Sequence, residues 1–566
     1  MQSLLDPAMA IAKAKAIAAA VAISLTVAAI VVAIWLPRAV LLVARGDVRE
    51  LRPRASHAPS SRPSLFILAV DGIDRSLLYD MLRGGELPHL ERLLGGRDGR
   101  DLPHACLDER ILTVLPSTTI AAWATVFTGV PPGVHGMTGN EVFARDERAM
   151  LAPAPVSIDD ISPTLAVYTE ASLDRALDVP TIYQQMRARD PGMRIWVAMS
   201  QIYGGADRLI LAKRSVLSGA LAEFLSGSVE DTVARGVYEE LDEEVLDALT
   251  DELEDAEALP DVLTLYVAGT DLYAHHASAG PDAARRGYLR EVLDPRLGRL
   301  RARLEESGFL HRAYVVVLSD HGHTSVPRDA RHALGTEGPD EPPELLRRAG
   351  YRVRPFEWKV DEHADFQAVL AYNGAMASLY LADRSTCQAA GDACDWARPP
   401  RFDGDVLPAA RAFARANEAG ELVPALRGTL DMILVRRDGP DPFLAYTMGG
   451  ELASIADYLR SHPHPRYVDV ERRLRDLGAG PRGHRAGDVL LIANNGNVDA
   501  PAERFYFASQ YRSWHGSPSR QDGEIPVILA HPGRARAALC AMLDDVFPPE
   551  PRLHDVGRLL VRLREP

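Results

Sequence analysis

The chain has 566 residues, of which 47% are hydrophobic and 25% charged, a composition typical of a globular protein large enough for more than one structural unit. Its formal net charge of −15 argues against a protein that coats nucleic acid, because such a protein needs a basic face to neutralise phosphates. A small phosphorylated substrate that is held locally by metal ions remains compatible with this charge.

The first predicted element is a helix that crosses a membrane. Residues 16–36 form a run of 21 residues without a charge, which is long enough to span a bilayer. A cleaved signal peptide would have a shorter apolar core and a small-x-small site after it, whereas this run is followed by Pro37 and Arg38. We therefore expect an uncleaved N-terminal membrane anchor over 1–44, followed by a linker rich in Arg, Pro and Ser over 45–64.

Two opposing signals bear on which side of the membrane the body lies. More arginines follow the span than lysines precede it, and the positive-inside rule then favours a cytoplasmic body. Cys387 and Cys394 flank a short loop, and a disulfide between them would indicate an oxidising compartment, although two unrelated thiols are the alternative. Cys106 and Cys540, taken singly, predict nothing.

Beyond the linker, short apolar runs alternate with longer helix-like ones, which is typical of a mostly parallel sheet covered by helices on both faces. The predicted strands lie at 65–70, 110–114, 194–199, 262–269, 314–318, 488–493 and 526–530, and the predicted helices near 75–95, 119–128, 216–256 and 284–307. Residues 331–485 break this alternation, with strand-like pieces at 376–382 and 432–437. We expect an α/β fold whose core comprises residues 65–330 and 486–566, interrupted by a subdomain inserted over 331–485.

Aspartates follow three of the predicted strands. Asp71 follows 65–70, Asp271 follows 262–269, and Asp320 follows 314–318. A single aspartate in such a place is usually a helix cap or a turn former. In open parallel sheets, however, ligands bind at the carboxyl ends of the strands, so three aspartates at corresponding ends predict a common site.

Histidines accompany these aspartates. His275 lies four residues after Asp271, His321 lies beside Asp320, and His515 lies in a loop shortly before the strand 526–530. A lone histidine in a loop is more often a surface residue than a ligand. Three aspartates and three histidines together are enough to hold two borderline cations such as Zn²⁺.

Several motifs, in a fixed order, carry a resemblance to a known family. They are FILAVDG (66–72), LPSTTIAAWATVFTG (115–129), PPGVHGMTGN (131–140), DLYAHHASAGP (271–281), LSDHGH (318–323) and WHGSPSRQDGEIPVILAHPG (514–533). The chain resembles the alkaline phosphatase superfamily, and most closely its type I phosphodiesterase/nucleotide pyrophosphatase branch. The resemblance spans residues 65–563 and leaves out the anchor and most of the insert.

The resemblance implies a site for two divalent metal ions, which we expect to be zinc. One ion would be held by Asp71, Asp320 and His321, and the other by Asp271, His275 and His515. It also implies that Thr119 is the nucleophile and a metal ligand, and that Asn140 binds a phosphoryl oxygen. Ser117 and Thr118 are then interpreted as capping or loop hydroxyls. Three further histidines of the motifs match no ligand position and are interpreted as loop residues or as residues that contact a metal ligand without binding the ion: His135, His276 and His323.

The implied function is hydrolysis of phosphate esters of small molecules, as a phosphodiesterase or nucleotide pyrophosphatase that forms a phospho-threonine intermediate. A phosphomonoesterase or a phosphoryl-group transferase of the same superfamily is the alternative. The Cys/Ser-x-Pro-x-Arg motif of sulfatases does not match at Thr119, and a binding protein without activity would not need the complete set of ligands. Together with the cysteine pair, the resemblance leads us to expect a membrane-anchored protein with an extracytoplasmic body.

Overall fold

The computed structural model describes residues 48–52, 62–226, 231–361, 364–437, 439, 441–496 and 501–565. The predicted anchor lies outside the described residues, as does most of the predicted linker. Within the ranges that the structure describes, no helix is both long enough and apolar enough to cross a membrane.

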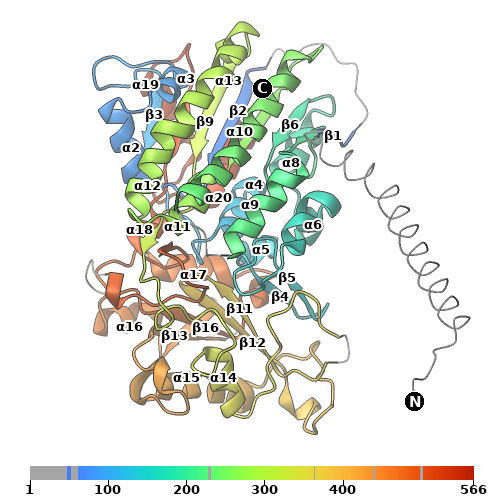
Figure 1. The fold of residues 1–566 in the computed structure, drawn as a ribbon, viewed down its shortest axis with the longest axis vertical. Helices are drawn as coiled ribbons and strands as arrows, with labels where there is room; N and C mark the ends of the chain where they lie inside the picture. Colours follow the sequence, from blue (N-terminus) through green and yellow to red (C-terminus); the bar gives the residue numbers. More distant parts are fainter. Residues whose placement is uncertain are drawn as a thin grey trace, which may run out of the picture.

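An eight-stranded sheet forms the larger half of the molecule (Figure 1). Its order is β1 (Val48–Glu50), β7 (Arg208–Ile210), β6 (Ile195–Ala198), β8 (Val262–Val267), β2 (Ser64–Val70), β9 (Ala313–Leu318), β18 (Val527–Ala530) and β3 (Ala105–Asp108). The strands from β7 to β9 run parallel, whereas β1 and β18 run antiparallel to their neighbours. The central sheet is therefore mixed, with a parallel middle.

Helices cover both faces of this sheet. Its central strands are therefore buried along their whole length. The covering helices are α2 (Arg75–Gly84), α3 (Pro88–Leu93), α4 (Thr119–Thr128), α8 (Ile182–Arg189), α9 (Arg214–Ser226), α10 (Asp231–Glu254), α12 (Pro281–Tyr288), α13 (Asp294–Glu306), α19 (Arg536–Val546) and α20 (Leu553–Arg562). Figure 1 shows α10 and α13 in front of the sheet, and α4 and α20 behind it. The predicted helices near 75–95, 119–128, 216–256 and 284–307 all contain helices of the structure.

A second, six-stranded antiparallel sheet forms the smaller half. Its order is β11 (Ala368–Asn373), β12 (Met376–Leu381), β16 (Val489–Ala493), β13 (Leu430–Arg436), β14 (Phe443–Tyr446) and β15 (Leu452–Ala453). The strand expected at 488–493 belongs to this sheet and not to the large one, so the second sheet extends beyond residue 485. A buried apolar strand has the same sequence pattern in either sheet. The remaining division into domains stays a prediction.

The strand expected at 110–114 is wrong. These residues form a connection in which Thr113 N–H donates to the carbonyl of Gly523 (2.9 Å), and only Leu112 forms an isolated bridge, to Glu524. The edge strand of this region is β3, which lies just before the expected segment. Its four residues are too few to show a clear alternation in the sequence.

All four cysteines of the chain form disulfides. Cys387 and Cys394 are bonded, as the short loop between them predicts. Cys106 of β3 is bonded to Cys540 of α19, across 434 residues of sequence. The second bond ties the edge of the large sheet to a C-terminal helix.

Candidate active site

The three predicted aspartates meet at one edge of the large sheet. Asp71 follows β2, Asp320 follows β9, and Asp271 lies in the first turn of α11 (Gly269–His276), which follows β8. Since β8, β2 and β9 are adjacent and parallel, their carboxyl ends lie side by side. All three carboxylates are buried.

Imidazoles converge on these carboxylates. His321 Nε2 lies 3.2 Å from Asp320 Oδ2 and 3.4 Å from Asp71 Oδ1. Asp271 Oδ1 faces the Nε2 atoms of His275 at 3.4 Å and of His515 at 3.7 Å. Among the described residues, three groups have the spacing of metal ligands: Asp71, Asp320 and His321; Asp271, His321 and His515; Asp271, His275 and His323. The first is a predicted set, whereas the predicted set of Asp271, His275 and His515 is divided between the other two.

The hydrogen bonds of the predicted histidine ligands fix their tautomers. The Nδ1 atom of His275 lies 2.8 Å from the carbonyl of Ser513, and that of His515 lies 2.9 Å from the carbonyl of Ser117. His321 Nδ1 lies 3.1 Å from the carbonyl of Gly322. A carbonyl only accepts, so each Nδ1 carries the proton and each Nε2 turns a lone pair toward the cluster. This is the tautomer that a metal ion requires.

His323 also belongs to the site. The hydroxyl of Ser513 donates to the carbonyl of Ala274 (2.7 Å), so it accepts from His323 Nδ1 (3.1 Å). His323 Nε2 then faces Asp271 Oδ1 at 2.7 Å. Contact with a predicted ligand is compatible with the interpretation of His323, but its place in a group with metal-ligand spacing also makes it a candidate ligand. The only signal in the sequence was the spacing of two imidazoles in DHGH.

The electrostatics of the cluster fit a cationic ligand. Asp71 Oδ1 and Asp320 Oδ2 are buried without a hydrogen-bond partner. Burial, together with repulsion by Asp320 and Asp271, raises the pKa of Asp71 well above its usual value. Burial also raises the pKa of Asp320 to about 7. Divalent ions would remove both the repulsion and the unsatisfied oxygens, and an Asp/His donor set suits zinc.

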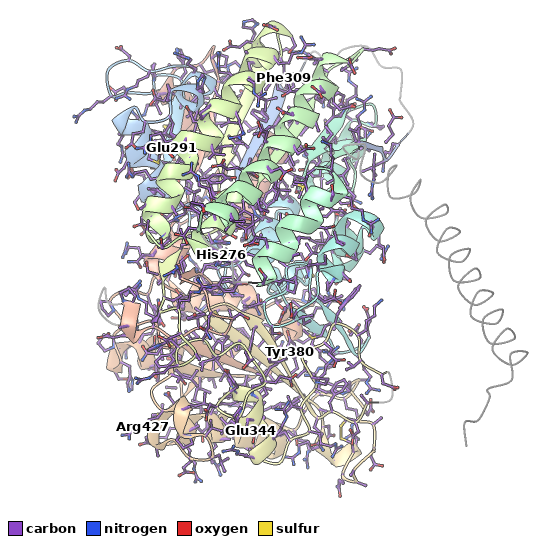
Figure 2. All side chains as sticks on the ribbon, viewed as in Figure 1. His276, Glu291, Phe309, Glu344, Tyr380 and Arg427 are labelled. Atoms are coloured by element: carbon purple, nitrogen blue, oxygen red, sulfur yellow. A yellow bond between two sulfur atoms is a disulfide. The ribbon has the colours of Figure 1, made fainter. Side chains whose placement is uncertain are left out.

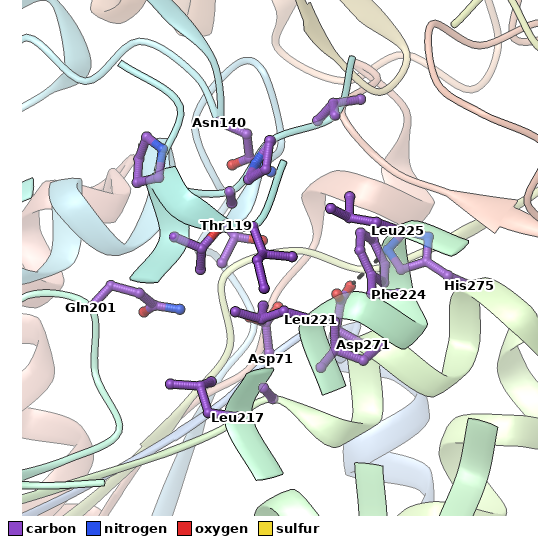
Figure 3. Close-up of a pocket in the computed structure, with 18 of the residues that line it drawn as sticks. Asp71, Thr119, Asn140, Gln201, Leu217, Leu221, Phe224, Leu225, Asp271 and His275 are labelled. Atoms are coloured by element: carbon purple, nitrogen blue, oxygen red, sulfur yellow. Dashed lines mark ion pairs between the residues drawn. The ribbon is translucent and has the colours of Figure 1, made fainter. Parts of the chain in front are cut away.

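Thr119 is the hydroxyl residue that lies at this cluster. It is the first residue of α4, and its Oγ1 atom lies 3.2 Å from His321 Nε2. Ser117 instead donates to the carbonyl of Ser517 (2.8 Å) and accepts from the Arg473 guanidinium (2.7 Å). Thr118 is the residue before the helix, and its hydroxyl is buried without a partner. Of the three consecutive hydroxyl residues, only Thr119 lines the pocket beside the carboxylates (Figure 3).

Asn140 lies at the N-terminus of the same helix. Its Oδ1 atom accepts from the backbone N–H of Ile120 (2.9 Å), which leaves its amide NH₂ group to bind an anion. The backbone N–H of Asn140 in turn donates to Oδ1 of Asn373 (2.6 Å). Asn373 is the last residue of β11, so the smaller half of the molecule supports the anion-binding end of the site.

The hairpin turn between β11 and β12 reaches a second site residue. Gly374 has a positive φ of 70°, and an added Cβ there would lie 2.1 Å from the carbonyl oxygen of His515. The next residue, Ala375, donates its N–H to that same carbonyl (2.9 Å). The hairpin therefore contacts both Asn140 and His515, a role for the 331–485 segment that the sequence did not indicate.

We expect Asn373→Ala to lower kcat/KM without releasing metal. The substitution leaves two buried N–H groups, those of Asn140 and Glu141, without their acceptor. This costs about 1–3 kcal/mol of stability per buried group and frees the Asn140 side chain to move. Steady-state kinetics, metal content and the thermal unfolding midpoint check this. Unchanged kcat/KM in a destabilised variant would limit Asn373 to a structural role.

The other two motif histidines lie away from the carboxylates. His135 contacts the hydroxyl of Thr125 (3.0 Å), and burial lowers its pKa to about 3. His276 stacks on Tyr238 and packs against Tyr511. Figure 2 shows His276 near the level where the two halves of the molecule meet. Neither belongs to a group with metal-ligand spacing among the described residues.

The fold and the site together define a class of enzyme. Buried carboxylates and imidazoles beside a hydroxyl at a helix N-terminus are typical of metal-dependent enzymes that act on phosphate groups. The family model of type I phosphodiesterase/nucleotide pyrophosphatase matches residues 65–384, more than half of the chain. The chain belongs to this family of the alkaline phosphatase superfamily, and it is a metal-dependent hydrolase acting on phosphoric ester or phosphoanhydride bonds. No curated protein matches the sequence.

Similar solved structures include murine ectonucleotide pyrophosphatase/phosphodiesterase 5, with a TM-score of 0.46 and 14% identity over 88% of this chain and 95% of that chain. An inactive variant of the murine protein in complex with AMP has a TM-score of 0.45 and 13% identity, over 89% of this chain and 95% of that chain. Phosphonoacetate hydrolase from Sinorhizobium meliloti 1021, in complex with phosphonoformate, has a TM-score of 0.42 and 16% identity, over 89% of this chain and 96% of that chain. Similarity at this level carries no statement about the substrate of this chain.

Proposed function

We propose that the protein is a phosphodiesterase that acts through a phospho-threonine intermediate on Thr119. The observation that carries the proposal is the position of Thr119. Its hydroxyl lies at the N-terminus of α4, against His321, and beside the carboxylate cluster. The backbone N–H groups of a helix N-terminus bind anions, so a phosphate group drawn to this point would lie next to the hydroxyl.

The residues present would hold two divalent ions, which we propose to be zinc. Asp71, Thr119, Asp320 and His321 would bind one ion, and Asp271, His275 and His515 the other. When bound, such ions supply positive charge that stabilises phosphoryl oxygens and lowers the pKa of a hydroxyl group. Asp271 Oδ1 lies 3.4 Å from His275 Nε2 and 3.7 Å from His515 Nε2, so both imidazoles face the same carboxylate oxygen.

In the proposed reaction Thr119 Oγ1 bonds to phosphorus, and one ester oxygen leaves as an alcohol that takes up the proton given up by the hydroxyl. The phospho-threonine intermediate keeps the second ester group. Asn140 binds a non-bridging oxygen through its amide NH₂ group, and the N-terminus of α4 stabilises the charge on the other oxygens. Water then attacks phosphorus and the bond between Thr119 Oγ1 and phosphorus breaks, so that the hydroxyl regains a proton and a phosphomonoester is released. The substrate is a small molecule with a phosphodiester bond.

Turnover of two chromogenic substrates tests this function. We expect the full chain, supplied with zinc, to hydrolyse bis-p-nitrophenyl phosphate with a higher kcat/KM than p-nitrophenyl phosphate. The reverse preference would move the protein to the phosphomonoesterases of the superfamily. Turnover of neither compound, with zinc bound, would favour a phosphoryl-group transferase.

We further propose that residues 1–44 anchor the protein in a membrane and that the body lies outside the cytoplasm. The charge-free run at 16–36 supports the anchor, and the two disulfides support an oxidising compartment. Treatment of intact cells with a protease that cannot cross the membrane tests the orientation. Cleavage of the body without lysis is the expected result, and protection until lysis would contradict it.

A further inference from the structure

The pocket that begins at Thr119 changes character along its length (Figure 3). One end is the polar cluster, with Asn140 and the predicted metal ligands. The other end is apolar, and the cavity as a whole has a volume of about 100 Å³. Its apolar lining includes the side chains of Leu217, Leu221, Leu225, Leu241 and Leu272 and the rings of Phe224 and Trp514.

Part of the apolar wall comes from one helix face. Leu217, Leu221 and Leu225 lie four residues apart on α9, so they share one side of the helix. Leu241 of α10 and Leu272 of α11 extend the same wall. Leu221 and Leu225 are only half-buried, so the wall presents apolar surface that a bound ligand could cover.

The apolar end offers few polar groups to a ligand. Within the described part of the chain no lysine or arginine lines the pocket, and its carboxylates are those of the metal cluster. The hydroxyls of Tyr168 and Tyr266 already donate, to the carbonyl of Met199 and to Asp71. Gln201 and Thr164 are the exceptions. Gln201 is 9% exposed and its Oε1 atom has no hydrogen-bond partner, and Thr164 also lines the pocket. Figure 3 shows the amide of Gln201 directed into the pocket.

We propose that this pocket binds an apolar ester group of the substrate, alkyl or aryl, in preference to a nucleoside. The inference rests on the proposed function, since the pocket opens onto the same site. An alkyl group would cover the leucines of α9, and each buried methylene improves binding by about fourfold. A nucleoside would bring several sugar and base polar groups, and the wall could pair few of them; each unpaired group weakens binding.

Inhibition by alkylphosphonates measures the pocket separately from turnover. The full chain with zinc is assayed on methyl p-nitrophenyl phosphate, and methylphosphonate, butylphosphonate and hexylphosphonate serve as competitive inhibitors. We expect the inhibition constant to fall by at least about tenfold from methylphosphonate to hexylphosphonate, since only part of the chain need be buried to give this gain. In direct competition, hexyl p-nitrophenyl phosphate should exceed the p-nitrophenyl ester of thymidine 5′-phosphate in kcat/KM.

Two variants locate the effect. Leu221→Gln should remove most of the gain from chain length, measured as the ratio of the inhibition constants for methylphosphonate and hexylphosphonate. Val216→Gln is the matched control, because it makes the same kind of change on α9 at a residue outside the pocket lining, and it should keep the gain. If Leu221→Gln lowers methyl ester turnover or the unfolding midpoint, Leu225→Gln replaces it.

The outcomes separate the two proposals. No turnover of the methyl ester by zinc-loaded wild-type protein would contradict the proposed function itself. If the methyl ester is turned over but the inhibition constant does not depend on chain length, the proposal of an apolar binding pocket is wrong. The proposed function is then unaffected. A thymidine ester preferred over the hexyl ester would also overturn the proposal of an apolar binding pocket, and so would an unchanged chain-length effect in Leu221→Gln.

Discussion

Thr119→Val is expected to reduce kcat by about 10³–10⁶-fold while the protein keeps its metal, since removal of a nucleophile has effects of this order. Valine has the shape of threonine and lacks only the hydroxyl, so the helix start at α4 is preserved. The carboxylates and imidazoles stay in place, and the metal-to-protein ratio should be that of the wild type. Activity is measured with bis-p-nitrophenyl phosphate, and metal content by elemental analysis.

Thr118→Val provides the matched control. It makes the same substitution one residue earlier, at a hydroxyl that is buried without a partner. Removing such a group costs no hydrogen bond, so stability should be unchanged or slightly higher. We expect near wild-type turnover. Wild-type turnover in Thr119→Val, or a comparable loss in both variants, would show that Thr119 does not attack phosphorus.

His275→Gln is expected to weaken binding of one metal ion by more than about 100-fold, because even partners outside the first coordination shell contribute up to that factor. The His275 imidazole turns its Nε2 lone pair toward Asp271 Oδ1, at 3.4 Å. Glutamine can replace the volume of the ring, but its amide is a poor ligand for zinc. Turnover should fall in parallel and recover in part at high zinc concentration. Calorimetric titration of metal-free protein measures the affinity.

His276→Gln makes the same change at the neighbouring residue of α11. Its ring faces Tyr238, Tyr511 and Phe224, away from the carboxylates. Metal affinity should therefore stay at the wild-type level, even if the lost ring packing lowers the unfolding midpoint. Equal losses of metal in the two variants would argue against His275 as a ligand.

The sequence could predict the site more fully than the fold. Asp71, Asp271 and Asp320 each follow a buried, apolar strand, and such strands are the easiest elements to recognise. Once those strands are parallel neighbours, their carboxyl ends must meet. His515 could be placed only through the family resemblance, because nothing local in its loop indicates which part of the sheet it approaches.

What the sequence could not predict depends on contacts across long stretches of chain. The strand at 488–493 pairs with β12 and β13, and its apolar pattern is compatible with either sheet. Cys106 and Cys540 lack any local signal that would join them. The contact of Asn373 with Asn140 requires two sheets to be placed against each other, which neither segment specifies alone.

The position of β18 sets the order in which the molecule can be completed during synthesis. This strand comes near the end of the chain, yet it lies between β9 and β3. Until it emerges from the ribosome, β9 and β3 lack their common neighbour and present open sheet edges, which invite aggregation. His515 arrives with the same late segment, and α20, which packs on α4, arrives last. A polypeptide that stalls before residue 515 would therefore carry most of the residues of the site without being able to assemble it.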